Sequence, residues 1–286
     1  MLLQRRLIYI FVLLALSLPL IFEYSSPPAR MPAAEAAFKS VEDLKVATGE
    51  IAFVALDFGP STKAENESQA LVLIEHLMRK RIPFALFSYY FQAEPFLTSI
   101  PEQVVNKLEK EYPDQVWRYG HDWVNLGYRP GAGMLIQAIP KSENLVQLFK
   151  KDARGNSLEH IPAFSKVRTI KDIKLLLEIT SLTGVFDVYI QYFQAGKYKP
   201  PFIHGATSIS VPGVFIYLDS GQLNGLLEGI SGAAWYSELL SKKYKDRAVD
   251  SAQVLNTSLG IAHLVIIFLI LLGNVVAFVE LYRRRQ

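Results

Sequence analysis

Cysteine is absent from all 286 residues of the sequence. A chain without thiols forms no disulfide, binds no iron–sulfur cluster or thiolate zinc site, and has no cysteine nucleophile. The sequence also lacks the HExxH zinc motif, the GxGxxG and GxxxxGK[ST] phosphate loops, and the GxSxG nucleophile elbow. No specific catalytic motif is therefore present, and we expect no cofactor.

Charge is nearly balanced, with 30 basic and 27 acidic residues and a formal net charge of +3. The basic residues are scattered except at the carboxyl terminus, and no basic stripe with interleaved aromatic residues is present, so we expect no nucleic-acid partner. Hydrophobic residues make up 50% of the chain. That fraction is high for a soluble protein and low for a multi-span transporter, which favours one large folded domain with few membrane spans.

The longest apolar run, Leu259–Leu281, is followed by Tyr282 and by Arg283, Arg284 and Arg285. As a helix it would be about 35 Å long, enough to cross a hydrocarbon core of about 30 Å. We predict a transmembrane helix over 258–282 and a basic cytoplasmic tail over 283–286. Asn274 lies near the middle of this run; it is either a single tolerated amide or a contact with another helix.

Residues 1–23 have the features of a signal anchor, because Arg5 and Arg6 precede the apolar run Leu7–Phe22. A cleaved signal peptide is the alternative, but the first A-x-A sequence, Ala34-Glu35-Ala36, lies well past the run. The positive-inside rule then places both arginine clusters in the cytoplasm. The prediction is a two-pass protein of the plasma or inner membrane, with a Pro/Ala-rich linker over 24–49 and an extracytoplasmic domain over 50–257.

Within this domain, short apolar runs alternate with segments of helical spacing. The apolar runs do not alternate with polar residues, as expected for parallel strands that are covered on both faces. The predicted strands are Glu50–Asp57, Ile82–Tyr89, Ile173–Thr180 and Pro201–Ser208, and the predicted helices are Ala64–Arg81, Pro101–Tyr112, Ser142–Lys151 and Val185–Phe193. The glycine- and aromatic-rich part of 113–165 reads as a structured loop. The fold class is α/β: a Rossmann-like, mostly parallel sheet with flanking helices, held between an N-terminal and a C-terminal transmembrane helix.

Four glycines, Gly221, Gly225, Gly229 and Gly232, recur at steps of four, four and three. We expect a helix over Pro212–Leu240 in which these glycines let it pack closely on its own domain or on a neighbouring copy. A loop, or two short helices broken by glycine, is the alternative. A third membrane span is disfavoured by polar residues at 219, 222, 224 and 228.

Ligands of open α/β sheets bind at the carboxyl ends of the strands. The residues at those ends that could bind a ligand are Asp57, Ser61, Thr62, Ser88 and Thr207. The loop from Asp57 to Thr62 leads into a helix amino terminus, which suits an anion. The simpler interpretation is that Asp57 and Ser61 only shape a strand–helix turn.

Asp57, Ser88, His121 and His204 include the residue types of a nucleophilic triad, although any domain of this size contains them. The five histidines are spread along the chain without metal-ligand spacing, and His76 reads as a surface or boundary residue. We therefore predict a non-enzymatic, membrane-anchored component of a membrane protein assembly. Its partners would be the lipid bilayer and other membrane proteins or copies of itself. A membrane-tethered domain that binds a small ligand is the alternative, and a membrane-anchored hydrolase is the third possibility.

Overall fold

The computed structural model describes residues 2–131, 133–245 and 247–283. Contacts within the chain divide it into two units. The helical unit consists of Met1–Pro28 and Ala248–Gln286, and the α/β unit consists of Ala29–Arg247.

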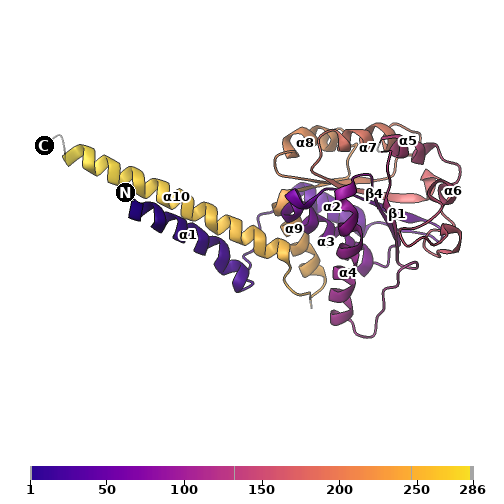
Figure 1. Cartoon of the computed structure of the whole chain (residues 1–286), viewed down its shortest axis with the longest axis horizontal. Coiled ribbons are helices and arrows are strands. Elements are labelled where there is room, and N and C mark those ends of the chain that lie inside the picture. Colours follow the sequence, from indigo (N-terminus) through magenta and orange to yellow (C-terminus); the bar gives the residue numbers. More distant parts are fainter. Residues whose placement is uncertain (1, 132, 246, 284–286) are drawn as a thin grey trace. The chain divides into compact units, whose positions relative to one another are not determined.

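A six-stranded parallel sheet forms the centre of the α/β unit (Figure 1). Its strands are β1 (Ile51–Asp57), β2 (Phe84–Ser88), β3 (Trp123–Tyr128), β4 (Ile173–Thr180), β5 (Phe202–Ala206) and β6 (Gly225–Glu228). They lie in the order β3-β2-β1-β4-β5-β6, and each neighbouring pair is parallel. This is the strand order of the Rossmann fold, in which the winding reverses between β1 and β4. The predicted Rossmann-like α/β fold is confirmed.

Helices cover both faces of the sheet. Those of the α/β unit are α2 (Pro32–Glu42), α3 (Lys63–Arg79), α4 (Glu94–Glu111), α5 (Gly133–Lys141), α6 (Leu145–Phe149), α7 (Val185–Phe193), α8 (Val211–Asp219) and α9 (Gly229–Lys243). Figure 1 shows α5, α7 and α8 along one face and α3, α4 and α9 on the other. This arrangement explains the continuous apolar strands: all seven residues of β1, IAFVALD, are buried.

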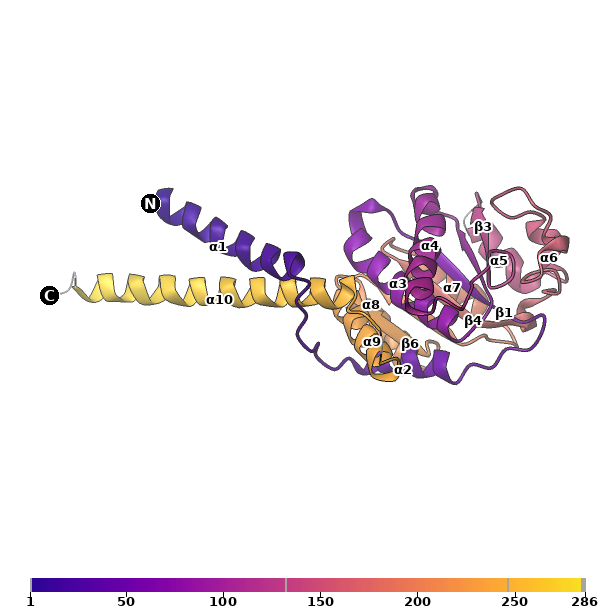
Figure 2. The ribbon, with the colours of Figure 1, turned by 90° about the horizontal axis from the view of Figure 1, so that it is seen from below.

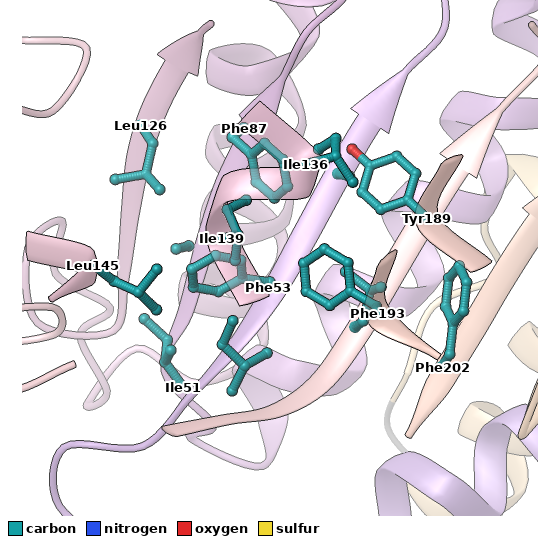
Figure 3. Packing of buried hydrophobic residues seen from close by; sticks show 14 of the residues in the cluster. Ile51, Phe53, Phe87, Leu126, Ile136, Ile139, Leu145, Tyr189, Phe193 and Phe202 are labelled. Carbon is teal, nitrogen blue, oxygen red and sulfur yellow. The ribbon is translucent and has the colours of Figure 1, made fainter. Parts of the chain in front are cut away.

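The face under α5 and α7 is packed with aromatic rings (Figure 3). The ring of Phe53 on β1 lies 5.7 Å from that of Phe87 and 6.1 Å from those of Phe149 and Phe164, centroid to centroid. Aromatic pairs at such distances contribute about 0.5–1.5 kcal/mol each beyond the burial of their apolar area. This cluster joins the sheet to the segments that follow β3.

The four strands predicted from apolar runs correspond to β1, β2, β4 and β5, whereas β3 and β6 were missed. β3 lies in the segment interpreted as a structured loop. Its Gly127 has φ +80°, a conformation that favours glycine and that interrupts the pairing register with β2. A strand broken by such a glycine has no continuous apolar run from which to recognise it.

Helix α2 corrects the prediction of a linker over 24–49. It lies beside strand β6 and helix α9 (Figure 2), and its buried side chains are small: Ala33, Ala34 and Ala37, followed by Val41. β6 is the last strand of the sheet, and an uncovered edge strand presents unpaired backbone groups. α2 packs on a face of β6, on the same side of the sheet as α9, so the segment is part of the fold.

The single helix predicted over Pro212–Leu240 is wrong. The segment forms α8, a turn at Gly221 with φ +74°, strand β6 from Gly225, and α9 from Gly229 with φ +56°. Three of the four glycines nevertheless lie in close contacts within one copy. An added Cβ would overlap the backbone of Ala37 at Gly225, would meet Ser208 at Gly229, and would lie 2.8 Å from the Leu227 carbonyl carbon at Gly232. Their predicted role in contacts with partners stays a prediction.

The helical unit contains α1 (Leu2–Ile21) and α10 (Ser251–Arg283), which run antiparallel (Figures 1 and 2). The Ser258 hydroxyl donates a hydrogen bond of 2.5 Å to the Leu16 carbonyl oxygen. Within the described residues, α10 is the one helix long and apolar enough to cross a membrane, and the apolar part of α1, Arg6–Ile21, is shorter. Arg284 and Arg285 of the predicted tail lie outside the described residues, as does the side chain of Arg5.

The close approach of α2 to β6 yields a test at Gly225. We expect Gly225→Ala to lower the free energy of unfolding by about 1–3 kcal/mol, because the added methyl group would overlap the α2 backbone. The matched control is Gly213→Ala in α8, where nothing lies within 4 Å of the added Cβ. This change should instead stabilise by about 0.4–1 kcal/mol.

Denaturant unfolding of the full chain in mild detergent, followed by tryptophan fluorescence, measures both effects. All three tryptophans, Trp117, Trp123 and Trp235, lie in the α/β unit, so the signal reports this unit alone. Equal stabilisation by the two substitutions would contradict the packing of α2 against β6.

Candidate functional site

The site expected from the strand order lies at the carboxyl ends of β1 and β4, where the winding of the sheet reverses. Asp57 ends β1 and Thr180 ends β4, and the two residues are paired in register. The Thr180 hydroxyl donates a hydrogen bond of 2.7 Å to the backbone oxygen of Asp57. The carboxyl group of Asp57 is thus held by its strand at the place where Rossmann folds bind ligands.

The Asp57 carboxylate is completely buried, and both of its oxygens accept hydrogen bonds from the protein. Oδ1 accepts from the Ser88 hydroxyl at 2.7 Å and from the Tyr89 backbone N–H at 3.1 Å, and Oδ2 accepts from the Tyr189 hydroxyl at 2.9 Å. Figure 3 shows the Tyr189 ring reaching in from α7 toward the sheet. The carboxylate therefore joins β1, the end of β2 and α7, and presents no oxygen to solvent.

The pKa of Asp57 is raised to about 7, first by burial and then by the negative charge of Glu178. The hydrogen bonds from Ser88, Tyr189 and the Tyr89 backbone oppose this rise, because they stabilise the ionised form. Since burial dominates, Asp57 changes its charge near neutral pH.

Glu178 is a second buried carboxyl group on the same face of the sheet. It lies two residue pairs before the strand ends, beside Ala55 of β1 and His204 of β5. The His204 Nδ1 lies 2.5 Å from Glu178 Oε2, but its hydrogen bond is directed to the Glu178 backbone oxygen at 3.1 Å. Burial raises the pKa of Glu178, and the charge of His204 works against this rise.

The other predicted ligand residues lie apart from this cluster. The Thr62 hydroxyl donates to the Ser181 hydroxyl at 2.9 Å, and the Thr207 and Ser210 hydroxyl oxygens lie 3.1 Å apart. Ser61 is exposed in the turn before α3. The structure thus brings Asp57 and Ser88 together, whereas Thr62 and Thr207 pair with local serines. Ligand binding by these residues stays a prediction.

A nucleophilic triad requires a histidine within hydrogen-bond reach of the serine. The Ser88 hydroxyl instead donates to Asp57, lies 3.2 Å from the Tyr90 backbone oxygen, and accepts from the Tyr90 N–H at 2.9 Å. His204 is paired with Glu178, and His121 is exposed beside Tyr119. The described contacts therefore place neither histidine on Ser88.

The prediction that His76 lies at the surface or at its boundary is wrong. It is completely buried on α3, with Nδ1 2.6 Å from the Tyr236 hydroxyl and Nε2 2.6 Å from a Glu42 carboxylate oxygen. Burial lowers the pKa of His76, and the hydrogen bond and charge of Glu42 oppose that change. The residue connects α2, α3 and α9, and its role is structural. Among the residues that the structure describes, no group of three or more histidine, aspartate and glutamate residues could hold a metal ion.

Two cavities flank Tyr119, beside the outer strand β3, and sequence reasoning missed both. One, of about 260 Å³, is lined by Leu97, Thr98, Pro101, Glu102, Tyr119, Trp123, Asn125, Ala153 and Arg154. The other, of about 380 Å³, contains two histidines and is lined by Tyr119, Gly120, His121, Asn156, Ser157, His160, Ile161 and Pro162. The Arg154 guanidinium lies 3.6 Å from the Tyr119 ring centroid. The crowding of aromatic residues and glycines around Tyr119 was the available sequence signal.

No protein-family model, no characterised protein and no solved structure matches this chain.

The buried Asp57 yields a prediction about pH. An acid whose pKa is raised on folding binds its proton more tightly in the folded chain. Between about pH 4 and pH 7 the folded chain then holds more protons than the unfolded chain, so the free energy of unfolding falls as pH rises. We expect Asp57→Asn to remove this part of the slope, which denaturant titrations followed by tryptophan fluorescence will measure.

Two further variants make the test specific. Asp114→Asn, at an exposed position, should keep the slope of the unmodified chain. Tyr189→Phe removes a hydrogen bond that lowers the pKa of Asp57, so it should extend the slope to higher pH. A free energy of unfolding that rises with pH across this window in the unmodified chain, but not in Asp57→Asn, would contradict a protonated buried Asp57.

Proposed function

We propose that the chain is a non-enzymatic, membrane-anchored component of a membrane protein assembly. In this proposal α1 and α10 both cross the plasma or inner membrane, the two termini are cytoplasmic, and the α/β unit is extracytoplasmic. The observation that carries the proposal is α10, the one helix among the described residues with the length and composition of a membrane span.

The surface of α10 supports insertion into a bilayer. Its 33 residues correspond to about 50 Å of helix, longer than a hydrocarbon core of about 30 Å. Large apolar side chains project from it with little cover, including Leu264 at 67%, Phe268 at 63% and Phe278 at 72% exposure. Removing apolar surface from water is favourable by about 25 cal/mol for every Å². These side chains would gain this free energy in a bilayer but not in water.

The arginines and the pairing of α1 with α10 support the two-pass topology. Arg6 begins the apolar part of α1 and Arg283 ends α10, so in the antiparallel pair both lie toward the same end. The positive-inside rule assigns such an end to the cytoplasm. The apolar part of α1 is short for a span, and contact with α10 would help to hold it in the bilayer.

The buried chemistry of the α/β unit supports a non-enzymatic role. Asp57 is saturated by hydrogen bonds within the protein, and Ser88 is used in the same network. By contrast, Ile209 and Ile216, immediately before and within α8, are 91% and 68% exposed. Exposed apolar side chains of this kind suit a contact with another protein better than they suit catalysis.

A tethered domain that binds a small ligand is a second candidate function, and the cavities beside Tyr119 favour it. An aromatic ring, an arginine and an asparagine converge on one of them, a combination typical of small-molecule sites. Saturable binding of a small molecule that Tyr119→Ala abolishes, without a change in melting temperature, would support this candidate over the first.

The topology yields a direct test in intact cells. Epitope tags at both termini should be protected from protease added outside, because both ends are cytoplasmic in the proposal. A tag inserted at Gly155, in an exposed turn with nothing within 4 Å of the glycine, should be removed under the same conditions. Loss of the C-terminal tag from intact cells would refute the two-pass orientation.

Retention of the amino terminus is tested separately. The A-x-A sequence Ala34-Glu35-Ala36 lies inside α2, where Ala34 and Ala37 are completely buried. Cleavage there would divide the helix that covers β6, so we expect the mature chain to retain α1. Amino-terminal sequencing that begins near Ala37 would overturn this expectation.

A further inference from the structure

Helix α1 covers one face of α10. The covered residues recur at helical spacing: Val254, Ser258 and Ala262 are buried, and Val265 and Leu269 are partly buried. The hydrogen bond from Ser258 to the Leu16 carbonyl oxygen fixes this face against α1. The partner of this side of α10 is thus present within the same chain.

The amide of Asn274 projects from the other side. Asn274 follows Ser258 by 16 residues, which places it about 160° around the helix. It is exposed and makes no hydrogen bond within the described residues. Ile267 and Ile270 lie within about 40° of it and are 54% and 58% exposed. Gly260 lies on the same side and is also exposed.

We propose that this face, which we call the Asn274 face (Gly260, Ile267, Ile270 and Asn274), binds the same face of α10 in a second copy of the chain. The inference rests on the proposed insertion of α10 into a membrane, and it names one partner of the assembly. Lipid can cover the isoleucines as well as protein can, but it offers no hydrogen-bond partner to an amide. A partner that brings a polar group to the depth of Asn274 supplies the hydrogen bond that lipid lacks.

A second copy satisfies this requirement without further assumptions. Copies inserted with the same topology have parallel α10 helices, so their Asn274 residues lie at the same depth. A carboxamide carries both donors and an acceptor, so two identical amides can hydrogen-bond each other across a parallel pair. Because the side that faces α1 is on the other side of α10, each copy keeps its own α1–α10 contact.

The absence of cysteine makes the face directly measurable, because any introduced cysteine is the only thiol in the chain. We would purify full-length Ile267→Cys and Ile270→Cys variants, reconstitute them in phosphatidylcholine vesicles at low protein density, and oxidise them with copper phenanthroline. The matched controls are Leu272→Cys and Val276→Cys, at similar depth but about 160° from Asn274. We expect disulfide-linked dimers at 267 and 270 and little at 272 and 276.

A second substitution tests the amide itself. In the Ile270→Cys background, Asn274→Leu should weaken self-association roughly tenfold, since an interhelical side-chain hydrogen bond between membrane helices has about that effect on an association constant. Asn274→Gln, which retains an amide, should restore most of the cross-linking. Unchanged cross-linking in Asn274→Leu would overturn the role of the amide.

Extraction with alkaline carbonate separates this inference from the proposed function. Release of the full chain from membranes would refute insertion and therefore both proposals. A chain that stays in the membrane but cross-links equally at 267, 270, 272 and 276, or at none of them, would refute the Asn274 face and leave membrane anchoring intact. Cross-linking confined to 272 and 276 would place the second copy on the other side of α10.

Discussion

A parallel sheet has to be covered on both faces, and the α/β unit is built around this requirement. Its strands expose unpaired backbone groups at the outer edges, and their apolar side chains project from both faces. Helices α5, α7 and α8 cover one face, and α3, α4 and α9 cover the other. At β6 the cover includes α2, a helix with small buried residues that comes before the sheet in the chain. Gly225 is needed there because a larger residue would separate the strand from Ala37.

The helices that cover the sheet also bury two carboxyl groups, those of Asp57 and Glu178, on the strands between which the winding reverses. Buried charges are costly unless they are paired or neutralised. Asp57 and Glu178 differ in how this cost is met. Asp57 is surrounded by donors from Ser88, Tyr89 and Tyr189, so its ionised form is partly supported. Glu178 has His204 at its side but no side-chain hydrogen bond with good geometry. At the position that binds ligands in many Rossmann folds, the carboxyl group of Asp57 is thus hydrogen-bonded to the protein's own polar groups.

The helical unit differs from the α/β unit because many of its large apolar side chains are exposed. Among the described residues, the most apolar 18-residue stretch of α10 has no buried side chain, and a bilayer is the environment proposed above to cover it. In that environment apolar contacts discriminate little between lipid and protein, and polar groups decide which helices associate. In the proposed pairing of α10 helices, one amide would therefore influence association more than many surrounding leucines and isoleucines. In the α/β unit the apolar core drives folding instead, and buried polar groups such as the Asp57 carboxylate find their hydrogen-bond partners within the unit.

The sequence by itself determined the features that depend on the residues of one continuous segment. Continuous apolar runs identified β1, β2, β4 and β5 as covered parallel strands, because burial on both faces removes alternation. Helical spacing identified α3 and α7, and the length of the apolar run before Arg283 identified α10. Only the tertiary structure decided the rest: β3 and β6 have no long apolar run of their own, and α2 looks like a linker until β6 lies beside it. The burial of His76 and Asp57, and the cavities around Tyr119, arise from residues far apart in the chain. The pattern along a sequence reports how a segment is covered but not which distant segment covers it, because that second property depends on how the chain folds.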